Sequence, residues 1–292
     1  MNIGNTTASF GKNLIKYMLL LCIISHLVSG SQLVLASDSA DSRISVPLSY
    51  ADTADLVSAS GLVMTARIKS VRSVTTHPGS TPSEGTKYLL VNAEVESLIR
   101  GDNGVSPMVS FLALPNDGKS PAAFQPKSRQ TVLIFARPAA KPGQLSLVSR
   151  YAMQPWSAEL EATVRSITAE VVKPDAAPAI TAIGNAFHIA GTIAGESETQ
   201  IFLKTATGVP VSLTVLRRPG QPPRWGVSLG EIIDDSAVPP APSTLLWYRL
   251  ACSLPGRLPS AAMPDMGAAE IESAQRDYAF VLESLGRCGR TL

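Results

Sequence analysis

Short stretches in which apolar and polar residues alternate recur along this 292-residue chain, each bounded by turn-forming residues. In the first stretch, from Gly61 to Val74, the apolar residues Met64, Ala66 and Ile68 occupy every second position. A period of two is typical of a strand with one buried face and one face in water, so Thr65 is expected to face solvent. Many short strands of this kind restrict the fold to sheets that stack, close on themselves or are covered by helices.

The pattern divides the chain into two groups of strands and several helices. After a helix predicted at residues 50–59, the first group comprises five strands, at residues 61–74, 89–96, 108–114, 131–136 and 145–148. Residues 157–172 have apolar positions at helical spacing, and Pro174 stops the helix. The second group comprises residues 180–183, 186–189, 199–205, 209–216 and 224–229, the last three predicting an antiparallel meander. Two C-terminal helices are predicted at residues 244–254 and 265–285.

These elements predict an α+β protein of two domains, residues 37–174 and 175–292. The boundary rests on the short proline-bearing segment from Lys173 to Pro178, which has the composition of a linker. The alternative is that this segment is a loop inside one larger domain.

The N-terminus has the layout of a signal peptide. Residues 1–36 contain no acidic residue, carry Lys12 and Lys16, and continue into an apolar stretch of about a dozen residues. We predict cleavage after Ala36, with Gly30 as a second possible site and an uncleaved signal anchor as the alternative. Lipid attachment at Cys22 is rejected, because Leu21 stands where processing needs a small residue. The expected location is the periplasm or the outside of the cell.

The predicted cleavage also changes the charge. The full chain has 25 basic and 23 acidic residues, and residues 1–36 hold two of the basic ones. The remaining 23 of each give a formal charge of zero, which argues against a nucleic-acid partner. No later apolar run is long enough to predict a membrane span.

Cys252 and Cys288 remain as an even pair in an exported chain, which predicts a disulfide. On the loop-entropy relation, a closed loop of 36 residues removes denatured-state entropy worth about 4 kcal/mol. The alternative is two separate buried thiols. Two cysteines this far apart, with His77 and His188 distant from each other, provide no zinc-ligand spacing, so no metal site is predicted.

Residues 50–150 resemble the netrin-like, tissue-inhibitor-like version of the OB fold. The resemblance lies in Ala54-Asp-Leu-Val57 with Leu62 to Lys69, in Val95 to Gly101, and in Gln130 to Phe135. It implies that the first group of strands forms an OB-like five-stranded β-barrel. The inhibitors of that family act through an N-terminal cysteine, which the predicted mature N-terminus lacks, so inhibitor activity is not carried over. The second half, around Phe187-His188 and from Glu196 to Arg218, is similar to exported bacterial proteins without an assigned activity.

Few residues suggest catalysis. His188, Glu196 and Glu198 form one carboxylate–imidazole neighbourhood that could perform acid–base chemistry, and the alternative is a solvated turn beside a half-buried histidine. Ser228 lies in a GxSxG pattern, but both histidines of the mature chain precede it and no long helix is predicted to follow. We expect Ser228 on the outer face of a strand.

Arginines are concentrated at one predicted hairpin. Arg217, Arg218, Arg224 and Trp225 bracket a Pro-Gly turn, and their guanidiniums could bind a carboxylate or phosphate. The alternative is ion pairing with acids that follow, namely Glu231, Asp234 and Asp235.

The sequence therefore favours an exported, non-catalytic protein that binds another envelope protein or an anionic ligand. No glycine-rich phosphate loop is present, and we predict no cofactor. The alternatives are a periplasmic hydrolase using the Glu/His site and a signal-anchored envelope protein with the same domains.

Overall fold

The structure is a computed structural model that describes residues 48–75, 87–116, 124–230 and 237–292. All of these residues belong to one compact unit. The predicted signal peptide lies outside the described residues.

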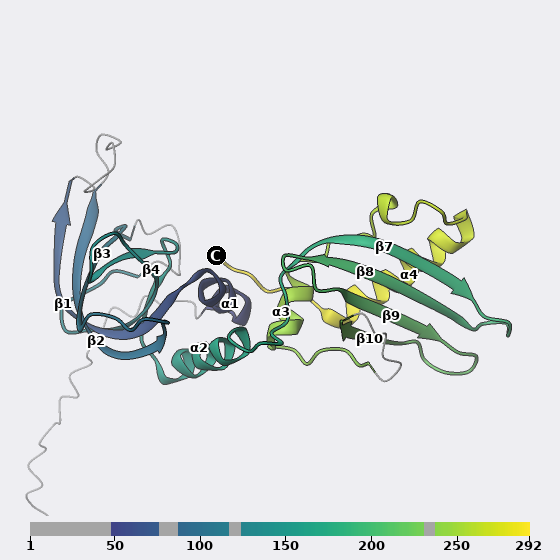
Figure 1. Cartoon of the computed structure of the whole chain (residues 1–292), viewed down its shortest axis with the longest axis horizontal. Helices are drawn as coiled ribbons and strands as arrows, with labels where there is room; N and C mark the ends of the chain where they lie inside the picture. The colour runs from purple at the N-terminus through teal and green to yellow at the C-terminus, as the bar shows by residue number, and fades with distance from the viewer. Residues whose placement is uncertain (1–47, 76–86, 117–123, 231–236) are drawn as a thin grey trace, which may run out of the picture. The chain divides into compact units, whose positions relative to one another are not determined.

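Five strands close into a barrel in the first half of the chain (Figure 1). They are β1 (Leu62–Val74), β2 (Tyr88–Arg100), β3 (Met108–Ala113), β4 (Thr131–Pro138) and β5 (Gln144–Leu147). Neighbouring strands pair in the order β1-β2-β3-β5-β4, and β4 pairs back to β1. The pairing is antiparallel except between β3 and β5. The five-stranded OB-like barrel of the predicted α+β fold is confirmed.

A sixth strand, β6 (Met153–Pro155), extends the sheet beside β4. Sequence patterning did not predict it, because three residues are too few to show an alternation.

Apolar side chains on one face of each strand fill the barrel. Met64, Ala66 and Ile68 of β1 are buried with Val91 of β2 and Phe111 of β3.

The prediction that Thr65 faces solvent is wrong, since this residue is buried. Its neighbour on the same face, Val63, packs into a second cluster with α1 (Tyr50–Ala59) and α2 (Ala158–Val171). The beginning of β1 is therefore covered on both faces.

Each of these two helices begins where a serine caps it. The Ser49 hydroxyl accepts from the Asp52 backbone N–H at 3.0 Å, and the Asp52 carboxylate accepts from the Ser49 backbone N–H at 3.2 Å. Ser157 accepts from the Leu160 N–H at 3.1 Å. Both predicted helices are confirmed, the first with its predicted ends and the second one residue shorter at each end.

Four strands in the second half form one antiparallel sheet, in the order β10-β9-β8-β7. They are β7 (Ile180–Ala190), β8 (Ser197–Thr205), β9 (Val211–Arg217) and β10 (Arg224–Leu229). The prediction of two strands before residue 190 is wrong. A register shift between Ile183 and Ala186 takes up the intervening residues as a bulge, so β7 continues through them.

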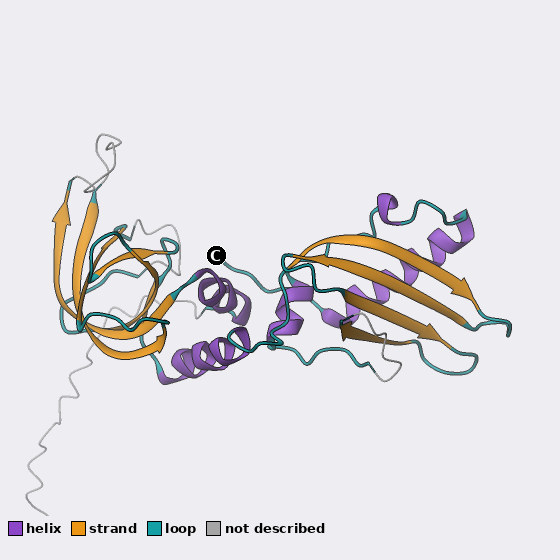
Figure 2. Cartoon of the chain, viewed as in Figure 1, coloured by secondary structure: helices purple, strands orange, loops and turns teal. Residues whose placement is uncertain are grey.

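Helices α3 (Leu245–Ala251) and α4 (Ala268–Leu285) follow the sheet, with a 3-10 helix at Ser260–Ala262 between them. Figure 2 shows α4 running behind the four strands. Its apolar stripe, Ala274, Tyr278 and Val281, is buried in one cluster with Ile201 and Leu213 of the sheet. The two predicted C-terminal helices are confirmed, and each is shorter than its predicted range.

Cys252 follows α3 and Cys288 follows α4, and their Cα atoms lie 4.8 Å apart, joined by a disulfide. The predicted pairing is confirmed. None of the helices in the described part of the chain combines the length and the apolar character that a membrane crossing requires.

Candidate functional site

The four-stranded sheet has two chemically different faces. Register places His188 opposite Thr199, Thr199 opposite Val215, and Val215 opposite Trp225, and these residues turn toward α4. We call this side the helix face. Because alternate residues of a strand point to opposite sides, the register row of Glu198, Leu216 and Arg224 belongs to the other side, the open face.

A buried ionic network lies on the helix face. Asp277 of α4 is 1% exposed and accepts from the Arg217 Nε at 2.6 Å and from the Thr199 hydroxyl at 2.5 Å. The Nδ1 of His188 lies 2.8 Å from the Thr199 Oγ1 and 3.8 Å from the Asp277 Oδ2. The network joins β7, β8 and β9 to one helix.

The donors and acceptors of this network determine which nitrogen of His188 carries a proton. A carboxylate can only accept, so the single Thr199 proton goes to Asp277. The Thr199 oxygen must then accept from His188, which places a proton on Nδ1. The His188 side chain is only 8% exposed, and both carboxylate oxygens have donors. This arrangement ties α4 to the sheet.

Sequence reasoning did not find Asp277 as the acid that lies near His188. A signal was available, because Asp277 follows Ala274 by three positions and precedes Val281 by four, on the apolar stripe of α4. An acid at such a position must find buried partners, since an unpaired buried charge is strongly unfavourable.

The predicted catalytic residues do not converge around His188. Glu198 belongs to the open face, where its Oε1 accepts from the Gln200 side chain at 2.6 Å. Glu196 lies in the turn between β7 and β8, where its backbone oxygen accepts from the Gly191 N–H at 2.8 Å. Ser228 is buried within β10 on the open face, opposite Ser212, and not at a strand-to-helix turn.

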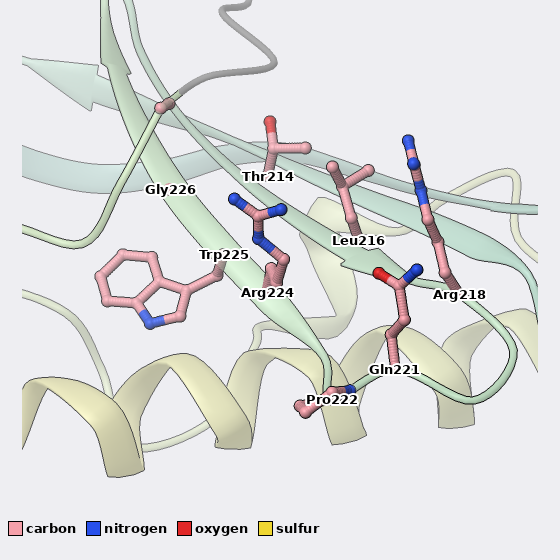
Figure 3. A pocket seen from close by; sticks show the side chains of 9 residues that line it. Thr214, Leu216, Arg218, Gln221, Pro222, Arg224, Trp225 and Gly226 are labelled. Atoms are coloured by element: carbon pink, nitrogen blue, oxygen red, sulfur yellow. The ribbon is translucent and has the colours of Figure 1, made fainter.

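The predicted arginine cluster is divided between the two faces. Arg217 points to Asp277 on the helix face, and the buried Trp225 donates from Nε1 to the Ser284 hydroxyl of α4 at 2.8 Å. Arg218 and Arg224 remain exposed at the other side. Figure 3 shows the Trp225 ring directed toward the helix, away from the side chains of Arg218 and Arg224.

Arg218 and Arg224 line a hollow of about 90 Å³, which we call the arginine hollow. The described residues that line it are Thr214, Leu216, Arg218, Gln221, Pro222, Arg224, Trp225, Gly226 and Ala237. Strands β9 and β10 supply the floor and their connecting hairpin supplies one end (Figure 3).

Gly226 allows the chain to close the other end of the hollow. A Cβ at this position would collide with the backbone carbonyl of Ala237, which passes directly over the strand. Only glycine therefore permits this close approach.

Three polar side chains of the arginine hollow, Arg218, Arg224 and Thr214, lack an ion-pair or hydrogen-bond partner inside the described part of the chain. Neither Arg218 nor Arg224 forms an ion pair there, and none of the described lining residues is acidic. Thr214 is 6% exposed, and its hydroxyl is buried without a hydrogen-bond partner among the described residues. The acids that were considered as ion-pair partners at the sequence level, Glu231, Asp234 and Asp235, lie outside the described residues.

A larger and more apolar groove of about 520 Å³ lies on the barrel. Strands β3 and β5 pair only at Ser110 with Gln144 and at Phe111 with Leu145. Residues that follow in both strands, including Leu112 and Leu147, line the groove where the pairing has ended. Its volume lies in the range of small-molecule sites.

In the described ranges, no group of three or more His, Cys, Asp or Glu side chains is placed to hold a metal ion. A scan against protein families found no family that matches the chain, and a search of the curated proteins also found no match.

Proposed function

We propose that the chain is an exported, non-catalytic binding protein that recognises an anionic group of a ligand or envelope partner through the arginine hollow. The observation that carries the proposal is the arginine hollow itself, in which two guanidiniums without an ion pair among the described residues accompany a buried hydroxyl without a partner.

The electrostatics of the arginine hollow favour an anion. Guanidinium groups remain charged at all physiological pH values and present parallel N–H donors to carboxylate or phosphate oxygens. Two like charges lining one small hollow repel each other, and a bound anion removes this repulsion. An anion also supplies an acceptor to the Thr214 hydroxyl, whose isolation costs about 1–3 kcal/mol in typical buried sites.

The alternative is a periplasmic hydrolase that uses His188 with Glu196 or Glu198, and it has less support. Its imidazole is nearly buried and hydrogen-bonded to Thr199, and Glu198 belongs to the opposite face of the sheet. The arginine hollow and the barrel groove do not include His188.

Two observations support export. The first 36 residues have the layout of a signal peptide, and Cys252–Cys288 is a bond that persists in oxidising compartments. We expect the protein recovered from cells to begin at Ser37 and to lie in a periplasmic or secreted fraction. N-terminal sequencing of that protein tests this, and a chain that still begins at Met1 in the membrane fraction would favour the signal anchor.

Thermal unfolding of the purified full chain tests anion binding. At constant ionic strength, sulfate or phosphate at about one hundred times its Kd should stabilise the wild type by about 2.7 kcal/mol, which is a rise in Tm of about 5–10 °C. The Arg218→Ala/Arg224→Ala variant should show no such rise, whereas Arg257→Ala, which removes an exposed arginine outside the hollow, should respond like the wild type. Equal stabilisation of the double variant would refute the proposal.

A further inference from the structure

We infer that the group bound in the arginine hollow is a phosphate monoester rather than a carboxylate. This inference rests on the proposed function and specifies its ligand class. It follows from the charge, the donors and the size of the hollow.

Charge is the first reason. The charged side chains in the described lining are Arg218 and Arg224, which together carry two positive charges. A carboxylate neutralises one of them and leaves the other positive charge in the hollow without a counter-charge. A phosphate monoester carries about −1.5 to −2 at pH 7 and matches both.

The donors give the second reason. Each guanidinium can present two parallel N–H groups, and the Thr214 hydroxyl and the Gln221 carboxamide add further donors in the same hollow. A carboxylate has two oxygens, which two guanidinium forks already occupy. The three terminal oxygens of a phosphate monoester leave one acceptor for the hydroxyl of Thr214.

The position of Thr214 supports this assignment. It pairs with Gly226 in the register of β9 and β10, so it lies on the open-face side of the sheet, two positions from Leu216 and within the lining. Its hydroxyl is buried without a partner among the described residues, and an anion oxygen in the hollow would supply the missing acceptor.

The size of the hollow limits what is enclosed. A volume of about 90 Å³ holds several water molecules, but it is below the 300–1,000 Å³ of sites that enclose a whole drug-sized ligand. The hollow therefore encloses one charged group and leaves the remainder of the molecule outside. Both a free phosphate monoester and a lipid headgroup of this type present such a group.

The test compares methyl phosphate with acetate by titration calorimetry on the purified full chain at pH 7.5. Methyl phosphate should bind at least tenfold more tightly than acetate, and Arg218→Ala and Arg224→Ala should each weaken its binding at least tenfold. Arg257→Ala is the matched control and should bind like the wild type. Acetate that binds as tightly as methyl phosphate, with the same dependence on both arginines, would overturn the phosphate assignment and leave the proposed function intact. Failure of both probes and of sulfate would refute the proposed function as well.

The pH dependence separates the two ligand classes further. Guanidinium groups are always charged in proteins, and no histidine or acid belongs to the described lining, so the described residues give the hollow no pH dependence of their own. The second ionisation of a phosphate monoester lies near pH 6, so methyl phosphate should bind about tenfold more weakly at pH 5. Sulfate, which keeps its two charges, should not change. A methyl phosphate affinity that does not change with pH would contradict recognition of the dianion.

Thr214→Val removes the hydroxyl and keeps the shape of the side chain. It should weaken methyl phosphate binding at least threefold without lowering the Tm, because the folded protein loses no hydrogen bond among the described residues. A lower Tm with unchanged binding would show that the hydroxyl stabilises the fold. It would contradict the proposed contact between the Thr214 hydroxyl and the third phosphate oxygen.

Vesicles distinguish the two sources of the same group. Arg218- and Arg224-dependent binding to vesicles that contain phosphatidic acid, compared with pure phosphatidylcholine, supports a lipid headgroup as the source. Binding of methyl phosphate without vesicle binding supports a soluble phosphate monoester. Each result is consistent with the inference and assigns the ligand to one source.

Discussion

Replacing Asp277 by Asn tests the network that joins α4 to the sheet. The substitution keeps the size of the side chain and removes the charge that pairs with Arg217 at 2.6 Å. Removing one partner of a buried ion pair typically costs 3–5 kcal/mol. Because the Arg217 side chain is 29% exposed, water can solvate the remaining guanidinium, and we expect about 3 kcal/mol, the lower end of that range.

Thermal or denaturant unfolding at pH 7 measures this loss. For a folded unit of this size, about 3 kcal/mol corresponds to a fall in Tm of about 6–12 °C. Glu283→Gln, at an exposed position of the same helix, is the matched control and should change stability by no more than about 0.5 kcal/mol. A loss below about 1 kcal/mol for Asp277→Asn would refute the argument that the network holds α4 in place.

Three further predictions concern stability. Replacing both Cys252 and Cys288 by Ala should lower the free energy of unfolding by about 4 kcal/mol in denaturant titrations, and an unchanged transition midpoint would contradict the loop-entropy reasoning. Gly226→Ala should lower the free energy of unfolding by about 1–3 kcal/mol in calorimetry, because the new Cβ meets the backbone of Ala237. An unchanged Tm would show that the segment at Ala237 moves aside freely. Burial raises the pKa of Asp52, but hydrogen bonds from Thr291 and Ser49 outweigh it and hold the pKa below its usual value. The resulting stability is present above the ordinary carboxyl pKa and is lost as the pH falls through the lowered pKa of Asp52. The stability difference between wild type and Asp52→Asn should therefore shrink from pH 6 to pH 3. A constant difference would exclude this contribution.

Much of the fold follows from periodicity that is visible in the sequence. The longer barrel strands show alternation over six or more residues or a continuous apolar run, as in Thr131 to Ala136, and both patterns were sufficient to place them. The bulge in β7 was missed because Gly184 and Asn185 resemble a turn in sequence, whereas the pairing with β8 continues on both sides. Local patterns describe propensity, and only the partner strand decides between a turn and a bulge.

The site was less accessible to sequence reasoning. The Pro-Gly hairpin correctly placed Arg218 and Arg224 at one end of the sheet, but the face of each residue depends on register. Arg217 and Trp225 point to the helix face because side chains alternate along a strand. The sequence does not reveal the register of the hairpin, so it could not predict this face. Thr214 had no signal in the sequence, because a threonine in a strand is common and only the structure shows that its hydroxyl is buried without a partner in the described ranges.

A crystal structure of the protein with methyl phosphate is the measurement that tests the central claim most directly. We predict a phosphate group in the arginine hollow, with oxygens within hydrogen-bond distance of the guanidiniums of Arg218 and Arg224 and of the Thr214 hydroxyl. A complex in which methyl phosphate binds elsewhere while both arginines point into solvent would contradict anion recognition at this site.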